Sequence, residues 1–378
     1  MKSDNHSSKH SITVDVLIIG AGPAGLSAAR ILAENNRSVI VLEKNKTLGK
    51  KVCAGGLTAK DLDYIPKEIV ERKFNKFCLV LRNEKQTNKK YETLRMNTKN
   101  HRIVTIDRQK LGRYLAKKAE DSGAKILLNS EMVQIKDNFV LCKTKKSGII
   151  DHKKIFFKNL IGADGSLSIV RKHLGLSSNK IWHTIQYKVK NNAVKYQAQD
   201  LEVIIDPEKF GYSFAWIFPH KKYTYVGTGG PIAALKEKNM GELKTNLGIL
   251  CAERCFKNKK FESSIINCDY KGHEFAINYS DNRKIFLAGD AGGFASELTG
   301  EGIYSAIISG QEIAKKIINP EYNCKPIKDI LRTKKRHTFL AGCASSKMLS
   351  RFMLTGLLPF LFKNKSIARK FNQIFNMV

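Results

Sequence analysis

The chain has 378 residues, of which 42% are hydrophobic, and its 66 lysines and arginines against 34 aspartates and glutamates give a formal charge of +32. This length suffices for one large domain or two of ordinary size with a substantial buried core. The absence of a run of about 18 apolar residues argues against a membrane-spanning helix, and no zinc-finger or RNP-type signature supports binding to nucleic acid.

The net charge and the cysteines limit the partners and the cellular compartment that we expect for this protein. Three causes of the charge remain open: a nucleic-acid partner, an anionic membrane surface, or a composition rich in lysine throughout. The eight cysteines form no CxxC pair, so we expect no disulfide framework, no metal site and a cytoplasmic location. Residues 1–12 are polar, which predicts a disordered tail and not a signal peptide.

The N-terminal segment shows the order strand, glycine-rich turn, helix and strand. An apolar run at Val16–Ile19 precedes the GxGxxG glycines Gly20, Gly22 and Gly25, and the second apolar strand ends in Glu43. In such a βαβ unit the first glycine makes the tight turn, the second lets the backbone approach a pyrophosphate, and the third lets helix and strand pack closely. The helix N-terminus faces the anion, and the acid accepts bonds from ribose hydroxyls. The segment therefore predicts a dinucleotide site.

The stretch KKVCAGGLTAK follows this unit and contains an unusual thiol. Cys53 is followed by Ala54 and by the pair Gly55–Gly56, with lysines on both sides. Glycines permit positive φ angles and a close approach of the backbone to a ligand. The thiol is either a proton donor near a reactive centre or a small buried hydrophobe beside a turn.

Two further motifs join strand ends to helix starts. Arg108 opens a helix that leads to a short strand, and Asp164-Gly165 follow another strand, with Arg171 at the opening of the next helix. Each arginine has two interpretations, a contact to the cofactor or an ordinary cation at a helix start.

An aromatic strand is predicted in the segment FGYSFAWIFPHKKYTYVGTGG. Because side chains alternate along a strand, Tyr212, Phe214, Trp216 and Phe218 share one face. That face either lines a substrate cavity or belongs to an ordinary sheet core.

A second polar corner lies far along the chain. The buried strand Ile285–Ala288 turns at Gly289-Asp290 and leads through a glycine-rich loop to a helix from about Glu301. A carboxylate at a strand end can bond the hydroxyls of a ribityl chain. The helix N-terminus at Gly302–Ile303 would stabilise negative charge on a reduced flavin ring. An ADP site near the N-terminus and a ribityl site far along the chain favour FAD over NAD.

These motifs resemble those of known flavoproteins. The Asp164-Gly165 and Gly289-Asp290 corners resemble the DG and GD motifs of flavoproteins built like para-hydroxybenzoate hydroxylase. Cys53-x-Gly55-Gly56, and Trp216-x-Phe218-Pro219 followed by Gly227-x-Gly229, resemble the geranylgeranyl reductase family, including the archaeal digeranylgeranylglycerophospholipid reductases.

The resemblance implies an α/β fold in which a Rossmann-like FAD-binding domain carries an inserted antiparallel β-sheet substrate domain and is followed by C-terminal helices. The FAD-binding domain is discontinuous, and the substrate domain fills its gaps. The expected boundaries are 13–60, 103–175 and 281–318 for the FAD-binding domain, 61–102 and 176–280 for the substrate domain, and 319–378 for the helical region.

The resemblance also implies the site. Cys53 is the expected catalytic residue, on a loop over the flavin ring, and Arg108 is expected near the flavin diphosphate and ribityl chain. The expected substrate contacts are Tyr212, Phe214, Trp216 and Phe218. The expected FAD contacts are Gly20, Gly22, Pro23, Ala24, Gly25, Glu43, Lys44, Cys53, Ala54, Gly56, Arg108, Val133, Asp164, Gly165, Asp290, Gly302 and Ile303.

The expected function is FAD-dependent reduction of carbon–carbon double bonds in geranylgeranyl or polyprenyl groups on a lipid, with NAD(P)H or ferredoxin as electron donor. Two alternatives stay open: an FAD-dependent hydroxylase of the same fold, and a basic membrane- or RNA-binding protein in which FAD is structural. The apolar segment Met353–Phe362 lies among cations. It caps the substrate tunnel, docks on an anionic membrane as a peripheral contact, or packs as a helical hairpin.

Overall fold

The computed structural model describes residues 11–82, 91–97, 103–146, 148–191, 200–211, 213–232, 240–271, 277–280 and 283–345. Tyr212 and the segment Met353–Phe362 lie outside the described residues. Strand β1 begins at Ser11, so the last two residues of the predicted N-terminal tail belong to a strand.

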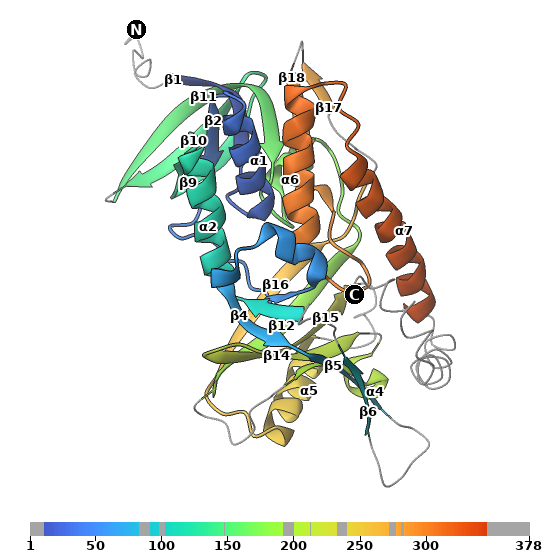
Figure 1. The fold of residues 1–378 in the computed structure, drawn as a ribbon. Coiled ribbons are helices and arrows are strands. Elements are labelled where there is room, and N and C mark those ends of the chain that lie inside the picture. The colour runs from blue at the N-terminus through green and yellow to red at the C-terminus, as the bar shows by residue number, and fades with distance from the viewer. Residues whose placement is uncertain are drawn as a thin grey trace.

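A mixed sheet of eight strands forms the upper half of the molecule in Figure 1. Its order is β17-β18-β11-β1-β2-β8, with β10 pairing β11 and β9 pairing β10. The strands from β18 to β8 run parallel. Val16–Ile19 at the end of β1 and all of β2 are apolar and buried, as is typical of parallel strands with both faces covered. The bounds are β1 (Ser11–Ile19), β2 (Val39–Leu42), β8 (Lys125–Leu127), β9 (Ser130–Ile135), β10 (Phe139–Lys146), β11 (Ile149–Gly162), β17 (Ile277–Ser280) and β18 (Arg283–Leu287).

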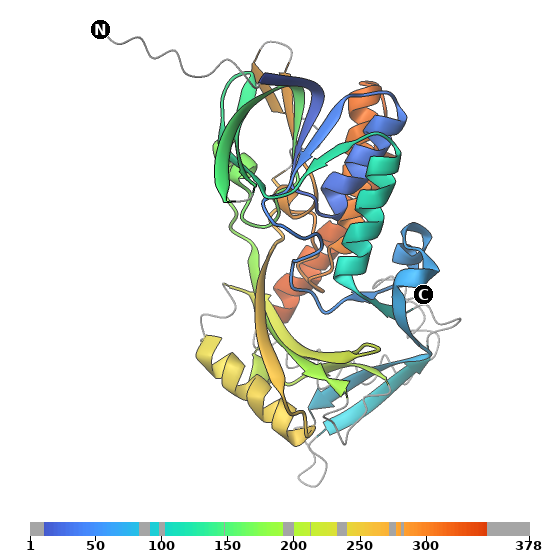
Figure 2. The same ribbon diagram turned by 90° about the vertical axis from the view of Figure 1, so that its left-hand side faces the viewer.

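Helices α1 (Pro23–Glu34), α2 (Arg108–Asp121) and α6 (Ile303–Ile318) lie side by side on one face of this sheet (Figures 1 and 2). Helix α1 starts with Pro23, whose fixed φ suits the first helical position. It crosses α6 closely, because a Cβ added to Gly310 on α6 would lie only 2.0 Å from the backbone oxygen of Ala24. This packing places the N-terminal end of α1 against the middle of α6.

A second sheet of seven strands forms the lower half, in the order β16-β12-β15-β14-β13-β5-β6. Its neighbours are antiparallel except for the parallel pair β5 and β13. Helix α5 (Met240–Glu253) covers one face, where Ala215 and Ile217 pack with Leu243 and Leu247. The bounds are β5 (Lys76–Arg82), β6 (Tyr91–Asn97), β12 (Ile181–Lys190), β13 (Leu201–Ile205), β14 (Phe214–Pro219), β15 (Tyr223–Pro231) and β16 (Lys259–Asn267).

A small sheet, β3-β7-β4, lies between the two halves. Strand β3 continues the Cys53 loop. The small sheet therefore joins this loop to the upper and lower halves of the molecule. The remaining elements are β3 (Gly56–Leu57), β4 (Val70–Phe74), β7 (Ile103–Ile106), α3 (Ile169–His173), α4 (Pro207–Phe210), α7 (Lys325–Ser345) and the 3₁₀ turns η1 (Ala59–Tyr64), η2 (Lys67–Ile69) and η6 (Gly289–Gly292).

This architecture confirms the predicted fold class, an α/β nucleotide-binding fold with an inserted and largely antiparallel sheet followed by a C-terminal helix. None of the helices in the described part of the chain is long and apolar enough to cross a membrane.

Candidate functional site

One large cavity, of about 1090 Å³, is lined by residues of both halves. The first glycine turn and the distant Asp290 corner meet at this cavity. Their closeness is shown at Gly289, where an added Cβ would lie 3.0 Å from the Cβ of Ala24. The predicted site residues that line the cavity are Gly20, Gly22, Pro23, Ala24, Glu43, Lys44, Cys53, Ala54, Gly56, Arg108, Asp164, Gly165, Phe214, Trp216, Phe218, Asp290, Gly302 and Ile303.

Gly25 and Val133 do not line the cavity. A Cβ added to Gly25 would lie 2.0 Å from the backbone oxygen of Gly20, so this glycine serves the close packing of helix on strand. Val133 lies one residue beyond the lining segment Ser130–Met132, and its side chain is 49% exposed. The alternation of β9 buries Met132 and turns Val133 outward, so the side chain of Val133 is not part of the site.

The first glycine turn has the geometry of a phosphate cradle. Gly20 has φ +106°, and a Cβ there would lie 2.3 Å from the backbone oxygen of Ala163, so only glycine fits. A Cβ added to Gly22 would meet nothing within 4 Å, which leaves space for a ligand. At the end of β2, the Glu43 carboxylate is fixed by hydrogen bonds from the backbone N–H groups of Ala21 and Asn45, both at 2.9 Å.

Arg108 supplies a cation at the cavity wall. Asp107 caps α2 by accepting bonds from the N–H groups of Gln109 and Lys110. Arg108 follows this cap, and its Nε and Nη1 atoms are buried without a hydrogen-bond partner among the described residues. Buried guanidinium donors without a partner in the protein need an acceptor, and an anion is the acceptor that a guanidinium binds most strongly. A diphosphate meets this requirement, and the residues around the cavity therefore fit FAD.

The Asp290 corner already has partners from two other segments. Its Oδ2 atom accepts hydrogen bonds from the ammonium of Lys51 and from the hydroxyl of Ser166, the latter at 2.8 Å. Its Oδ1 atom lies on the side of Gly302, where an added Cβ would be 3.4 Å away. The carboxylate thus stands beside the N-terminus of α6, as predicted for a ribityl contact. The sequence did not identify Lys51 or Ser166 as its partners.

The Asp164 motif is more structural than expected. Asp164 lines the cavity, but its Oδ2 atom caps α3 by accepting bonds from the N–H groups of Ile169 and Val170. Burial raises the pKa of Asp164. Arg171 is buried and donates to backbone carbonyls, including that of Ala291 at 3.1 Å, and it is not among the residues that line the cavity.

The Cys53 loop passes between the two halves. Cys53 lines the cavity, and its sulfur accepts a hydrogen bond from the N–H of Gly55 at 3.3 Å. Gly55 has φ +72°. A Cβ added to Gly56 would lie 2.5 Å from the ring of Phe218, so the loop lies directly against the aromatic strand.

The aromatic face of β14 forms the opposite wall. Phe214, Trp216 and Phe218 line the cavity, with successive ring centroids 6.1 and 6.5 Å apart. On β15, Gly227 lies opposite Trp216, and a Cβ there would be 2.3 Å from the indole. Gly229 lies opposite Phe214, but a Cβ there would lie 2.6 Å from the side chain of Thr184 on β12, so within the Gly-x-Gly motif it is Gly227 that makes room for a ring.

Sequence reasoning missed several members of this wall. Trp182 on β12 lies 6.1 Å from Phe214, measured between ring centroids, and is almost completely buried. Alternation indicates which residues share a face but not which face meets a cavity, so no local signal marked them. The other apolar side chains in this part of the lining are Phe77, Leu79, Ile103, Leu201, Val203 and Ile205.

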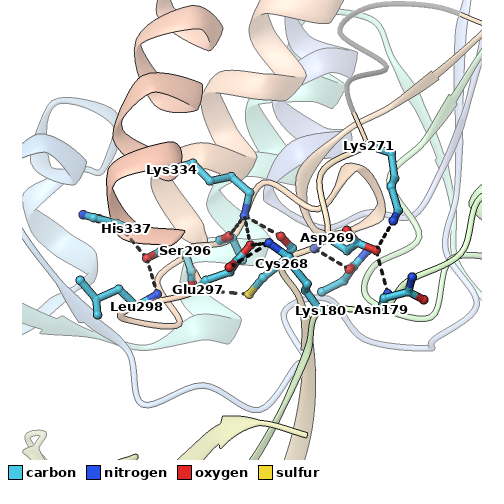
Figure 3. A network of polar contacts seen from close by, with 12 residues as sticks. Asn179, Lys180, Cys268, Asp269, Lys271, Ser296, Glu297, Leu298, Lys334 and His337 are labelled. Atoms are coloured by element: carbon cyan, nitrogen blue, oxygen red, sulfur yellow. Dashed lines mark hydrogen bonds and ion pairs between the residues drawn. The ribbon is translucent and has the colours of Figure 1, made fainter. Parts of the chain in front are cut away.

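Helix α7 contacts the segment 295–302, which leads into α6. The ammonium of buried Lys334 donates to two backbone carbonyls, at 2.6 and 2.7 Å, and the hydroxyl of Ser296 lies 2.9 Å from Nδ1 of His337 (Figure 3). Burial lowers the pKa of Lys334. Leu298–Gly300 in that segment and Leu340 on α7 line the cavity, so α7 shapes part of its wall.

Asp61 in η1 is a buried carboxyl group near the cavity wall. Its Oδ2 atom accepts bonds from the N–H and hydroxyl of Thr58, while Oδ1 has no hydrogen-bond partner among the described residues. Burial, reinforced by the charge of Glu301, raises the pKa of Asp61 to about 7.

We expect Asp61→Asn to make the free energy of unfolding less dependent on pH. The raised pKa means that the proton on Asp61 stabilises the folded wild-type protein below about pH 4, and that this contribution is lost as the pH rises to about 7. The loss is about 1.4 kcal/mol for each unit by which the pKa is raised. Denaturant unfolding across this range measures it, with the exposed Asp63→Asn as control. Equal pH dependence in both variants would contradict the assignment.

Comparison with known proteins agrees with this geometry. Digeranylgeranylglycerophospholipid reductase 3 of Methanosphaera stadtmanae is 28% identical over 330 residues, which cover 82% of this chain and 79% of the relative. A solved geranylgeranyl bacteriochlorophyll reductase-like protein from Thermoplasma acidophilum has a TM-score of 0.73 at 20% identity, with 97% of both chains covered. The p-nitrophenol 4-monooxygenase of Pseudomonas putida has a TM-score of 0.69 at 15% identity, with 97% of this chain and 98% of that chain covered. At such identities the structural likeness shows the fold alone.

The family comparison bears on the cofactor. Residues 13–324, which include both glycine-rich corners and the aromatic strand, match the family described as FAD binding domain. This match confirms FAD as the predicted cofactor and agrees with the unsatisfied donors of Arg108. The chain belongs to this family of FAD-binding proteins.

Proposed function

We propose that the protein is an FAD-dependent reductase that saturates carbon–carbon double bonds in the polyprenyl chain of a lipid. The observation that carries this proposal is a single cavity that extends from the cofactor residues to an apolar, aromatic wall, with Cys53 between them. The relative from Methanosphaera stadtmanae, named as a reductase of a geranylgeranyl lipid, supports the same substrate class.

The wall suits a long hydrocarbon chain. Rings from β12 and β14 and aliphatic side chains from β5 and β13 line it, and contact with such side chains removes an apolar substrate from water. Trp182 and Trp216 leave their indole nitrogens buried without a hydrogen-bond partner among the described residues. The rings and aliphatic side chains offer apolar contacts to a bound chain, and the two indole N–H groups are donors that such a chain leaves unpaired.

Saturation of an isolated double bond needs a hydride on one carbon and a proton on the other. Bound FAD in its reduced form supplies the hydride together with its electron pair. The chain must orient the alkene, exclude water and deliver the proton. Cys53 lies in the cavity wall, and its thiol is the group that we assign to proton delivery.

An FAD-dependent hydroxylase is the second candidate, because the p-nitrophenol 4-monooxygenase shares the fold. The two candidates differ in the use of oxygen. A hydroxylase consumes oxygen and adds an oxygen atom to its product, whereas the reductase adds two hydrogens for each bond and needs no oxygen.

The test is a single-turnover experiment under anaerobic conditions. Purified, FAD-loaded protein is reduced with dithionite and mixed with a geranylgeranyl glycerolipid in detergent, and a fully saturated lipid with the same head group serves as control. We expect the oxidised-flavin spectrum to return only with the unsaturated lipid, and the lipid mass to rise by two hydrogens per bond. Flavin that stays reduced, or a product that appears only in air and contains added oxygen, would contradict the proposal.

We also propose that NAD(P)H or ferredoxin supplies the electrons, and that the protein contacts an anionic membrane surface. Replacing dithionite with NADH, NADPH or reduced ferredoxin identifies the donor. Cosedimentation with anionic vesicles tests the peripheral membrane association that the charge of +32 supports.

A further inference from the structure

We infer that Lys334 on α7 is a positioning residue that sets the turn 296–301, and through it the N-terminus of α6, against the site for FAD. Only 7% of Lys334 is exposed. Its Nζ atom donates to the backbone oxygen of Cys268 at 2.6 Å and to that of Ala295 at 2.7 Å (Figure 3). Cys268 directly follows β16, and Ala295 directly precedes the turn. One side chain thus joins three segments that lie far apart in the sequence.

Neither bond depends on the charge of the Lys334 side chain. An ammonium has three N–H groups and a neutral amine has two, so both carbonyls are bonded in either state. Burial of the nitrogen would cost free energy without these two acceptors. The nearby Oε1 atom of Glu297, 3.9 Å from Nζ, adds a negative charge beside the cation. The contact therefore follows from the place and the donors of the side chain and not from its titration.

The turn that Lys334 holds is a compact unit. The N–H of Ser296 donates to the backbone oxygen of Glu301 at 2.8 Å, and the N–H of Gly300 donates to that of Ser296 at 3.0 Å. The hydroxyl oxygen of Ser296 accepts bonds from the N–H groups of Leu298 and Thr299, both at 3.2 Å. Because these bonds close the turn on itself, a shift at its first residues moves the turn as a whole.

A second side chain of α7 contacts the same turn. Nδ1 of His337 lies 2.9 Å from the hydroxyl oxygen of Ser296 (Figure 3). His337 follows Lys334 by three residues, so both side chains lie on one face of the helix. Their contacts fall on Ala295 and Ser296, which are consecutive in the chain. Helix α7 therefore fixes the start of the turn at two adjacent points.

The opposite side of the turn belongs to the cavity. Residues 298–303, from the turn into the start of α6, all line it. A Cβ added to Gly302 would lie 3.4 Å from the Cβ of Ala295 and also 3.4 Å from Oδ1 of Asp290. Ala295, whose carbonyl Lys334 holds, thus packs against the residue that begins α6 beside the Asp290 carboxylate. The position of Ala295 therefore sets where the first N–H groups of α6 stand in the cavity.

This placement bears on the reduced form of the cofactor. The N-terminus of a helix favours negative charge, and a reduced flavin ring carries negative charge that the oxidised ring lacks. N–H groups placed correctly at the start of α6 therefore stabilise reduced FAD more than oxidised FAD, and a displaced turn weakens this preference. The cradle at Gly20 and the cation of Arg108 belong to other elements. Loss of the Lys334 bonds should therefore change the reduction potential of FAD with little effect on the affinity for oxidised FAD.

The first test compares two variants that both weaken α7. Lys334→Met removes the donors and keeps a side chain of similar length, whereas Leu331→Ala removes a buried side chain from the core that α7 shares with α1 and α6. Both should lower the temperature of unfolding. In Lys334→Met alone we expect reduced FAD to bind about tenfold more weakly relative to oxidised FAD, which lowers the two-electron potential by about 30 mV. Equilibration of the FAD-loaded proteins with a reference dye measures the potential.

An unchanged potential in Lys334→Met overturns the inference. An equal shift in Leu331→Ala overturns it as well, because a general loosening of α7 would then be sufficient. Lys335→Met, which changes the exposed lysine next in the chain, serves as a second control and should keep the wild-type potential.

Ser296→Ala separates the position of the turn from the charge of Lys334, and it also covers the case in which Lys334→Met does not fold. It removes the hydroxyl that contacts His337 and accepts bonds within the turn, and it changes no charge. We expect the potential to fall in the same direction as in Lys334→Met. A wild-type potential in Ser296→Ala would assign the effect of Lys334→Met to its charge and so contradict the positioning role.

Amide hydrogen exchange follows the turn itself. In Lys334→Met the amides of residues 298–300 should exchange about tenfold faster than in the wild type, whereas those of β1 keep their rate. Unchanged exchange in the turn contradicts the role, and this measurement decides the question even for a variant that has lost FAD. The inference rests on FAD binding and not on the proposed reaction. None of these measurements uses a lipid, so their outcome is independent of whether a lipid is reduced.

Discussion

Replacement of Cys53 with serine is expected to leave FAD bound and to lower turnover by about 100-fold or more, the usual contribution of a positioned proton donor. The thiol lines the cavity between the glycine turn and the aromatic wall. Serine preserves the small volume and the hydrogen bond from Gly55, but a hydroxyl is a far weaker acid than a thiol. Single-turnover reoxidation of the reduced, FAD-loaded variant with the geranylgeranyl lipid measures the effect.

The control for this substitution is Cys255→Ser, which changes an exposed thiol two residues after α5. We expect wild-type turnover in that variant. Normal turnover in Cys53→Ser would assign the thiol to packing beside the turn, the alternative that the sequence left open. Loss of FAD from Cys53→Ser would instead place the residue among the groups that hold the cofactor.

Replacement of Asp290 with alanine is expected to weaken FAD binding by about 10- to 100-fold, the range for the loss of a hydrogen bond to a charged group. The carboxylate stands beside the N-terminus of α6, on the wall shared with the first glycine turn. Equilibrium titration of apoprotein with FAD, followed by quenching of flavin fluorescence, measures the affinity. Thermal unfolding of the apoprotein checks that the fold is intact.

Lys51 provides the matched control for Asp290. Its ammonium bonds the carboxylate that a ribityl hydroxyl would use, so Lys51→Met removes the ion pair and keeps Asp290. If the carboxylate binds the cofactor, Lys51→Met retains FAD at wild-type affinity or better, whereas Asp290→Ala does not. Equal affinity of Asp290→Ala and wild type for FAD would remove Asp290 from the site.

Local sequence patterns predicted the parts of the site that depend on backbone geometry. The backbone at Gly20 has a positive φ, and the helix at Gly25 packs too closely on the strand for a side chain. Both conditions are met by glycine, so both positions are visible in the GxGxxG pattern. The order of strand, turn and helix around Asp290 predicted its place beside α6. These features lie within a few residues of each other, so the sequence shows them.

Contacts between distant segments were not predictable in the same way. Cys268 and Lys334 are 66 residues apart in the chain, and nothing near either residue indicates its partner. Asp164 carries a motif that suggested a cofactor contact, yet its carboxylate caps α3. The outward turn of Val133 depends on the pairing of β9 with β10, which a single strand does not reveal.

The parallel pairing of β1 has a consequence for biosynthesis. β1 pairs with the nearby β2 and, along its length, with β11 at residues 154–162, and β11 pairs in turn with β18 at residues 284–287. The sheet beside the first glycine turn is therefore complete only when these distant segments are present. Such distant pairings form slowly, because a long loop must close before any contact rewards it. On a ribosome that releases the chain from its N-terminus, the cradle for the diphosphate is therefore completed only after most of the polypeptide has emerged, and FAD enters a nearly finished protein.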